Sequence, residues 1–144
     1  MANMNILVPV DGSDNAQRAL EHAASLVTHN PNLALRLLNV QQPGLYASVL
    51  EGIEGMEPMT QLLHQQGEEV LAPYIEWLNA KGVAFSTRVR LGKPFSVICE
   101  QASHHDCQRV VMGTRGNEGL DRFMLGSVAA QVAATAPVPV TLIK

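Results

Sequence analysis

Two hydrophobic patterns alternate along the chain. Short, continuous apolar runs such as residues 4–10 are typical of strands buried on both faces of a sheet. Between them, apolar residues recur every three to four positions, as at 16, 19, 20, 23, 24 and 27, which is typical of an amphipathic helix that packs on a sheet. The patterns predict strands at 4–10, 33–40, 83–91, 109–112 and 138–143, and helices at 16–27, 61–81, 95–104 and 127–135.

The regular alternation of strands and helices predicts an α/β fold over residues 1–144, with an open five-stranded parallel sheet, helices on both of its faces and right-handed crossovers. Ligands of such sheets sit beyond the carboxyl ends of the strands. The loops after the first and fourth strands carry Asp11 and Gly113. We therefore expect both residues on the rim where a ligand would bind.

Three features interrupt the regular pattern. Residues 41–58 have no clear period and predict a long loop of the kind that is often functional or mobile. Gly67 and Pro73 weaken the helix predicted at 61–81, and Pro73 is expected to kink or break it. Gly82 fits the position just past the end of that helix.

Composition limits the classes of partner. The chain has 144 residues, 47% hydrophobic and 4% aromatic, with a net charge of −3. It has no basic stripe for nucleic acid and no apolar run of the ~18–20 residues that span a bilayer. No secretion signal is recognisable, and Cys99 and Cys107 do not make a disulfide scaffold, so we expect a cytoplasmic location.

The most informative motif comes after the fourth predicted strand: Gly113, two residues, Gly116, nine residues, then Gly126 and Ser127. Glycine lets the backbone approach a ligand closely, and a helix N-terminus offers free N–H groups to an anion. The motif predicts a phosphate site that relies on backbone donors, with Ser127 as helix cap and phosphate donor. The alternative is a pair of ordinary turn glycines with a helix cap.

This motif resembles the nucleotide-binding signature of the universal stress protein family, in its ATP-binding branch. The resemblance extends to the opening segment Ile6-Leu7-Val8-Pro9-Val10-Asp11-Gly12-Ser13, to Gly92-Lys93-Pro94 and to Ala136-Pro137-Val138-Pro139-Val140, and so covers the whole chain. It implies one universal stress protein domain over residues 1–144, with a Rossmann-like sheet of the adenine nucleotide alpha hydrolase type and strand order 3-2-1-4-5.

The resemblance also implies a role for each matching residue. Asp11 and Pro9 would lie near the ribose, Val40 would meet adenine through its backbone, and Met112 and Gly113 would line the ribose-phosphate side. Phosphates would be held by Gly116, Gly126, Ser127 and Val128. Arg115 stands where many relatives have histidine and could add a phosphate contact, whereas Ala129 removes a hydroxyl that is common there. Mg²⁺ would accompany ATP, with Asp11 as the nearby carboxylate.

The sequence argues against several other kinds of functional site. The chain has neither a P-loop GxxxxGK[ST] motif nor a GxGxxG after the first strand. The sequence around Ser127 lacks the GxSxG form of a nucleophile. We interpret His104-His105-Asp106-Cys107 as the end of a helix, not as a metal cluster. Asp11 could also simply cap its own loop.

The resulting prediction is an ATP-binding regulator or sensor of the stress response. No catalytic residue is assigned, because no general base is recognisable. Two alternatives stay open: a slow ATPase or nucleotide-transfer enzyme in which Arg115 stabilises charge, and a nucleotide-free scaffold. The family resemblance implies a homodimer, and the apolar terminal strand at 138–143 is suited to pairing with a second copy.

Overall fold

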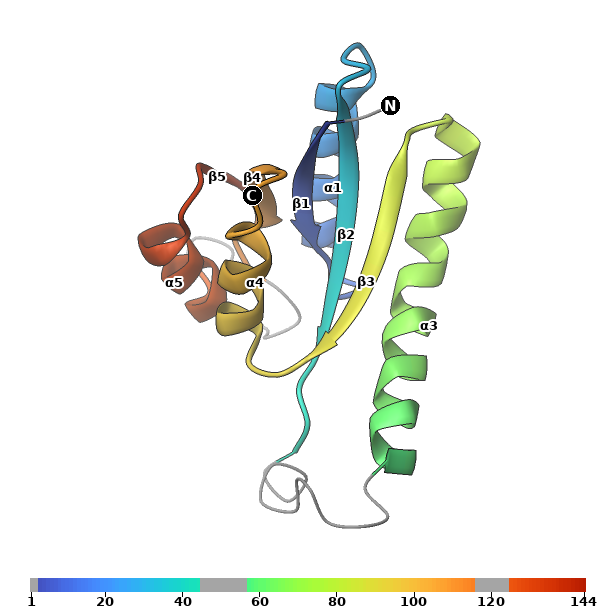
Figure 1. The fold of residues 1–144 in the computed structure, drawn as a ribbon, viewed down its shortest axis with the longest axis vertical. Coiled ribbons are helices and arrows are strands. Elements are labelled where there is room, and N and C mark those ends of the chain that lie inside the picture. The colour runs from blue at the N-terminus through green and yellow to red at the C-terminus, as the bar shows by residue number, and fades with distance from the viewer. Residues whose placement is uncertain (1–2, 45–56, 116–124) are drawn as a thin grey trace.

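The structure is a computed structural model that describes residues 3–44, 57–115 and 125–144. Most of the predicted loop at 41–58 and the predicted phosphate ligand Gly116 lie outside these residues. The helices and strands are β1 (Met4–Pro9), α1 (Asp14–Val27), β2 (Leu33–Gln41), α3 (Glu57–Lys81), β3 (Phe85–Leu91), α4 (Pro94–Ala102), β4 (Cys107–Gly113), α5 (Ser127–Thr135) and β5 (Val140–Ile143) (Figure 1).

The strands form one parallel sheet in the order β3-β2-β1-β4-β5, which confirms the predicted topology. The chain starts at the centre with β1, adds β2 and β3 on one side, and then crosses over to add β4 and β5 on the other. The direction of winding therefore reverses between β1 and β4, and a crevice opens at their carboxyl ends.

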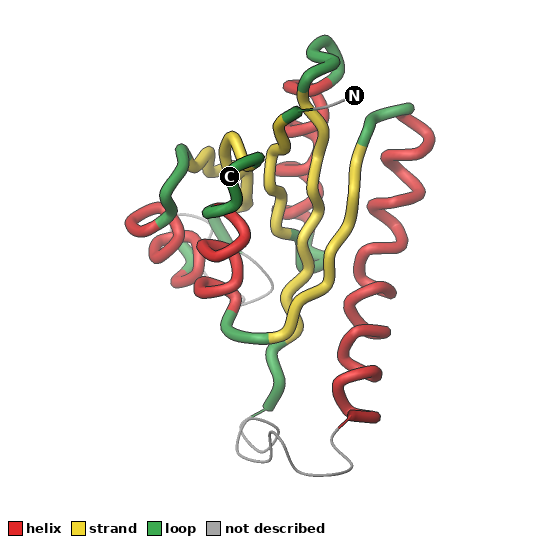
Figure 2. Tube along the Cα trace, in the orientation of Figure 1, coloured by secondary structure: helices red, strands yellow, loops and turns green. Residues whose placement is uncertain are grey.

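Helices cover both faces of the sheet (Figures 1 and 2). Helices α1 and α3 pack on one face, where Ile6 and Val8 of β1 belong to the larger core cluster. Helices α4 and α5 pack on the other face, where Leu7 joins a second cluster. Successive side chains of a strand point to opposite faces, so a strand between two helical layers is apolar at most positions, and buried polar residues such as Arg36 and Asn39 of β2 are hydrogen-bonded.

Helix α3 differs from its prediction in two ways. It begins at Glu57, before the predicted start at residue 61, and it runs through Pro73 without a break. Gly67 has a packing role, because a Cβ at this position would lie 2.5 and 2.9 Å from the two methyl carbons of Val89 on β3. Gly82 comes directly after the helix with φ +68°, and the Val83 amide donates to the Leu78 carbonyl at 3.4 Å, so its predicted place past the helix end is confirmed.

The other boundaries shift by a few residues. β3 and β5 begin later than predicted, at Phe85 and Val140, whereas β4 begins earlier, at Cys107. Pro139 has no N–H to donate to the ladder, although its carbonyl accepts from Val110 N at 2.9 Å, and β5 starts directly after it. None of the described helices is long and apolar enough to cross a membrane.

Candidate functional site

A cavity of about 170 Å³ lies at the carboxyl ends of β1, β2 and β4, beside the first turns of α1, α4 and α5. Eight of the ten site residues predicted from the sequence line it: Pro9, Asp11, Val40, Met112, Gly113, Arg115, Gly126 and Val128. Ser127 is exposed and is not among the lining residues, and Gly116 lies outside the described part of the chain. The predicted residues are thus largely brought together.

Six further residues line the cavity that the sequence did not single out as site residues: Val10, Ala16, Leu38, Pro94, Ile98 and Ala129. They are apolar or small, and apart from Val10, Pro94 and Ala129, which lie in or next to segments that resemble the family, they are indistinguishable in the sequence from core residues. What these six residues share is their position, because each lies near the end of a strand or in the first turns of a helix, and this position could have identified them as cavity residues. They make the walls of the cavity predominantly apolar, as is usual for small-molecule sites.

The backbone of Val40 faces the cavity side of β2. The Leu38 carbonyl accepts from Val10 N at 2.9 Å, on the side of β1, and the Gln41 carbonyl accepts from Gly92 N at 3.1 Å, on the side of β3. Because backbone groups alternate between the two neighbours of a strand, the N–H and C=O of Val40 face the side of β1. Strand β1 ends opposite Leu38, at Pro9, so β2 extends past it there.

The turn after β4 is held by three hydrogen bonds, two donated by its backbone amides and one accepted by its Thr114 carbonyl. Thr114 N donates to the Ile143 carbonyl at 2.9 Å, and Arg115 N donates to Asn15 Oδ1 at 2.9 Å. Gly126 N donates to the Thr114 carbonyl at 2.7 Å. In this structure the Gly126 N–H is bonded beside the end of β4, so a phosphate would have to replace that hydrogen bond for Gly126 to hold it as expected.

The start of α5 corrects the sequence interpretation. Gly126 is the N-cap, without a side-chain cap, and Ser127 is the first helical residue, so Ser127 is not the helix cap. Ala130 N donates to the Gly126 carbonyl at 2.9 Å. The amides of Ser127, Val128 and Ala129 occupy the first three helical positions, where no preceding turn supplies a carbonyl acceptor.

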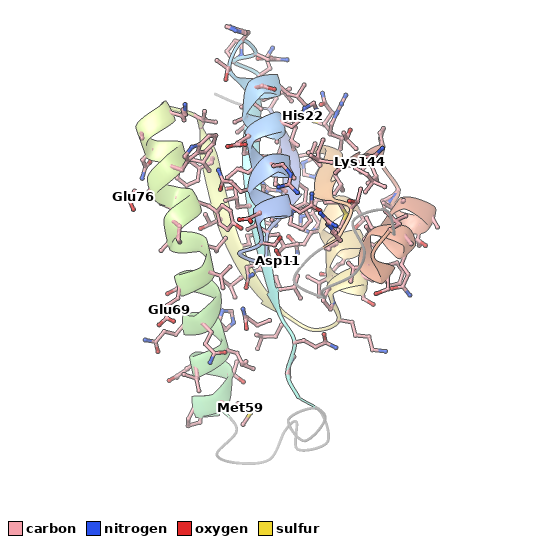
Figure 3. The ribbon with its side chains drawn as sticks, turned by 180° about the vertical axis from the view of Figure 1, so that it is seen from behind. Asp11, His22, Met59, Glu69, Glu76 and Lys144 are labelled. Atoms are coloured by element: carbon pink, nitrogen blue, oxygen red, sulfur yellow. The ribbon has the colours of Figure 1, made fainter. Side chains whose placement is uncertain are left out.

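The loop after β1 carries Asp11 at the end of α1 that faces the cavity (Figure 3). Asp11 Oδ1 accepts from Ser13 N at 3.0 Å, so Asp11 both shapes its own loop and lines the cavity. Ser13 Oγ caps α1 by accepting from Ala16 N at 3.1 Å. From α3, Tyr74 Oη accepts from Gly12 N at 2.9 Å, and burial, together with the charges of Asp11 and Asp14, raises the pKa of Tyr74.

The segment from His104 to Cys107 lies beyond α4, which ends at Ala102, and does not form its last turn as expected. Arg88 Nη1 and His104 Nδ1 lie 3.4 Å apart. Asp106 binds Arg36 through two hydrogen bonds of 3.0 and 3.1 Å, which lower the pKa of Asp106. Within the described ranges, no three His, Cys, Asp or Glu side chains gather closely enough to hold a metal ion.

Comparison with known proteins identifies the family. Residues 2–144 match the sequence model of the Universal stress protein family. The chain belongs to this family. A universal stress protein of Methanocaldococcus jannaschii is 32% identical over 139 residues, which are 96% of this chain and 81% of the relative.

Solved universal stress proteins share the fold. Universal stress protein UspA of Lactobacillus plantarum has a TM-score of 0.80 at 25% identity, with 100% of this chain and 99% of that chain covered. A family member from Arabidopsis thaliana with AMP bound has a TM-score of 0.68 at 22% identity, with 98% and 91% covered. A universal stress protein in complex with cAMP has a TM-score of 0.62 at 23% identity, with 100% and 99% covered.

Proposed function

We propose that this universal stress protein binds ATP in the cavity and acts as a nucleotide-dependent regulator of the stress response. One observation carries the proposal: the Asp11 loop, the backbone of Val40, the Gly113–Arg115 turn and the start of α5 converge on a single cavity. The AMP and cAMP complexes of two proteins with this fold support an adenine nucleotide as the ligand.

The adenosine half of the ligand would occupy the apolar part of the cavity. Leu38, Ile98 and Met112 lie on its walls, and all three belong to the core cluster beneath α4 and α5. A planar base buries apolar area against such walls and needs a few placed polar groups for orientation. The N–H and C=O of Val40 supply a donor and an acceptor side by side, which suits the edge of adenine.

The phosphates would lie between the start of α5 and Arg115. The first amides of α5, from Ser127 to Ala129, have no preceding helical turn to bond to, and they lie at the positive end of the helix dipole. Arg115 adds a cation at the cavity wall. Among the described lining residues, Asp11 carries the one carboxylate, and Mg²⁺ on a nucleotide is commonly held by one or two carboxylates together with the phosphates.

The competing proposal is a slow ATPase or nucleotide-transfer enzyme that uses the same cavity, with Arg115 stabilising charge on the transferred phosphate. Arg115 lines the cavity in either case, so the two proposals differ only in whether the bound nucleotide is cleaved. Steady-state phosphate release above the buffer rate, abolished by Arg115→Ala but not by Arg18→Ala, would favour the enzyme. Binding without release would favour the regulator.

We also propose that two copies pair through β5. This strand is the last of the sheet on its side, and its four residues are all half-buried. An apolar strand at a sheet edge offers unpaired backbone groups to a second copy. Gel filtration with light scattering should give the mass of two chains, and the mass of one chain would contradict this part of the proposal.

The decisive experiment measures binding directly. Nucleotide released from the denatured protein is identified, and ATP, ADP, AMP and adenosine are then titrated by calorimetry. The exposed hydroxyl of Ser127 would add a donor to phosphates that extend past the cavity, so Ser127→Ala and Arg115→Ala should each weaken ATP binding several-fold while leaving adenosine binding unchanged. The matched controls Ser25→Ala and Arg18→Ala replace exposed residues of α1 that do not line the cavity.

Two results would contradict the proposal. A wild-type protein that binds none of the four ligands would exclude nucleotide binding. If both Ser127→Ala and Arg115→Ala bound ATP and adenosine with wild-type affinity, the phosphates would have to lie elsewhere.

A further inference from the structure

Asn15 is a buried amide in the first turn of α1, with 4% of its surface exposed. Its Nδ2 donates to the carbonyl of Ile143 at 2.8 Å, and its Oδ1 accepts from the amide of Arg115 at 2.9 Å. The side chain thus joins three segments that are far apart in the sequence: α1, the turn after β4 and the end of β5. Removing this side chain is costly, because the Arg115 amide loses its acceptor and the Ile143 carbonyl loses one of its donors in a partly buried place.

The turn is enclosed from two sides by these contacts. The Ile143 carbonyl accepts a second hydrogen bond from Thr114 N at 2.9 Å. At Gly113, a Cβ would overlap Asn15 Oδ1 and lie 2.7 Å from Asn15 Cγ, so the amide plane packs directly against the turn backbone. Gly113 and Arg115, on either side of Thr114, both line the cavity.

We propose that Asn15 is a positioning residue that makes the C-terminal strand β5 part of the nucleotide site. By holding Ile143 and Arg115 together, Asn15 fixes the turn in the shape that the ligand meets. The inference rests on the proposed function and extends it. A site whose backbone is ordered before binding has less conformational entropy to lose, so its affinity is higher. Coupling is reciprocal, so a bound nucleotide also stabilises the end of β5.

The first test compares two side chains that connect α1 to the end of the chain. Arg18 Nε donates to the Lys144 carbonyl at 2.9 Å, but this contact is exposed and does not reach the turn. AMP affinity should fall about tenfold in Asn15→Ala and stay within twofold of wild type in Arg18→Ala. Equal affinities of wild type, Asn15→Ala and Arg18→Ala for AMP would overturn the proposal.

A second variant distinguishes positioning from general stability. In Asn15→Asp, the new carboxyl can accept from Arg115 N in either protonation state, but it can donate to the Ile143 carbonyl only when protonated. The ratio of the AMP dissociation constants of variant and wild type should therefore fall toward one between pH 8 and pH 5. The neighbouring charges Asp11, Asp14, Arg18, Arg115 and Lys144 are present in both proteins, so their own titration affects both dissociation constants, and the ratio reports the new carboxyl under the influence of these charges. A ratio above one that does not change with pH would overturn the proposal.

Hydrogen exchange of the ligand-free protein keeps this test separate from the proposed function. The Arg115 amide should be protected in wild type and Arg18→Ala, and it should exchange at least tenfold faster in Asn15→Ala. Wild-type protein that binds none of ATP, ADP, AMP and adenosine would contradict the proposed function, while fast exchange in Asn15→Ala would still support the positioning of the turn. An Arg115 amide that stays equally protected in Asn15→Ala would contradict the role of Asn15 whether or not AMP binds.

Discussion

The two ends of the sheet hold their loops by different chemistry. At the amino end, charged side chains meet: Arg36 of β2 binds Asp106 in front of β4, and Asn5 Nδ2 of β1 donates to the same carboxylate at 3.1 Å. At the carboxyl end, neutral side chains bind backbone groups. Asn39 Nδ2 donates to the Val10 carbonyl at 2.9 Å, Asn15 Nδ2 donates to the Ile143 carbonyl, and Tyr74 Oη accepts from Gly12 N.

This difference has a functional consequence. A neutral anchor fixes a loop without adding a charge beside the cavity, so the local charge is left to Asp11 and Arg115 at the cavity wall. The ion pair at the amino end stabilises the fold but depends on pH, because its carboxylate must stay ionised. Changes at the carboxyl end should therefore alter binding, whereas changes at the amino end should alter stability alone.

The largest effect is expected from Gly113→Ala. The added methyl group would overlap the Asn15 amide, and the packed turn has no room to move it, so unfolding free energy should fall by about 3 kcal/mol. AMP binding should weaken more than tenfold. Urea denaturation measures the free energy of unfolding, and calorimetry measures the AMP affinity. Gly44→Ala, with no atom within 4 Å of the new Cβ, is the control and should change neither.

Asp106→Ala tests the amino end. Removing the carboxylate leaves the buried guanidinium of Arg36 without its partner and should cost about 2 kcal/mol at pH 7. Because the folded pKa of Asp106 is lowered, this stability is present above the unfolded pKa of about 3.9 and is lost as pH falls through the folded value. The stability difference from wild type should shrink below about pH 4 in urea titrations, with AMP affinity at pH 7 unchanged. A constant difference down to pH 3 would refute the ion-pair explanation.

Gly82→Ala is a milder change at the amino end. Gly82 has φ +68°, a left-handed conformation in which a Cβ is strained, so we expect a loss of about 1 kcal/mol. No atom lies within 4 Å of the new Cβ, so packing should not contribute. Nucleotide affinity should match wild type. A variant that binds AMP tenfold more weakly would show that the two ends are not independent.

Tyr74→Phe should have the smallest effect on stability, about 0.5 kcal/mol, because Gly12 is exposed and water can replace the lost acceptor. The Asp11 loop loses its anchor to α3, so AMP affinity should fall about threefold. Calorimetry of this variant beside Gly82→Ala sharpens the comparison: the less destabilised protein should be the weaker binder. Weaker AMP binding by Gly82→Ala than by Tyr74→Phe would contradict the difference between the two ends of the sheet.

Much of the fold was predictable because its determinants are local. The apolar run of β1 and the spacing of Ala19, Leu20 and Ala23 in α1 require burial whatever surrounds them. Pro73 and Gly67 were misleading, since local propensity argues against a helix at both positions. Pro73 is exposed and Gly67 allows α3 to pack closely on β3, so the tertiary contact outweighs the local cost.

The candidate site was predictable in part for the same reason. Glycines and an aspartate directly after buried strands mark the rim of a parallel sheet, and eight predicted residues do line one cavity. Hydrogen-bond partners were not predictable. The Gly126 amide bonds to Thr114, and Ser127 stands one position after the N-cap, and neither fact can be deduced from glycine spacing.

The sequence by itself determined the order of strands and helices, the buried faces and the family, because periodicity and turn residues act over a few neighbouring positions. Only the tertiary structure decided that Asn15 joins the Arg115 turn to Ile143 and that Tyr74 reaches Gly12. Such contacts depend on where parallel strands bring distant segments, and a buried polar side chain is selected by its partners in space, not by its neighbours in sequence.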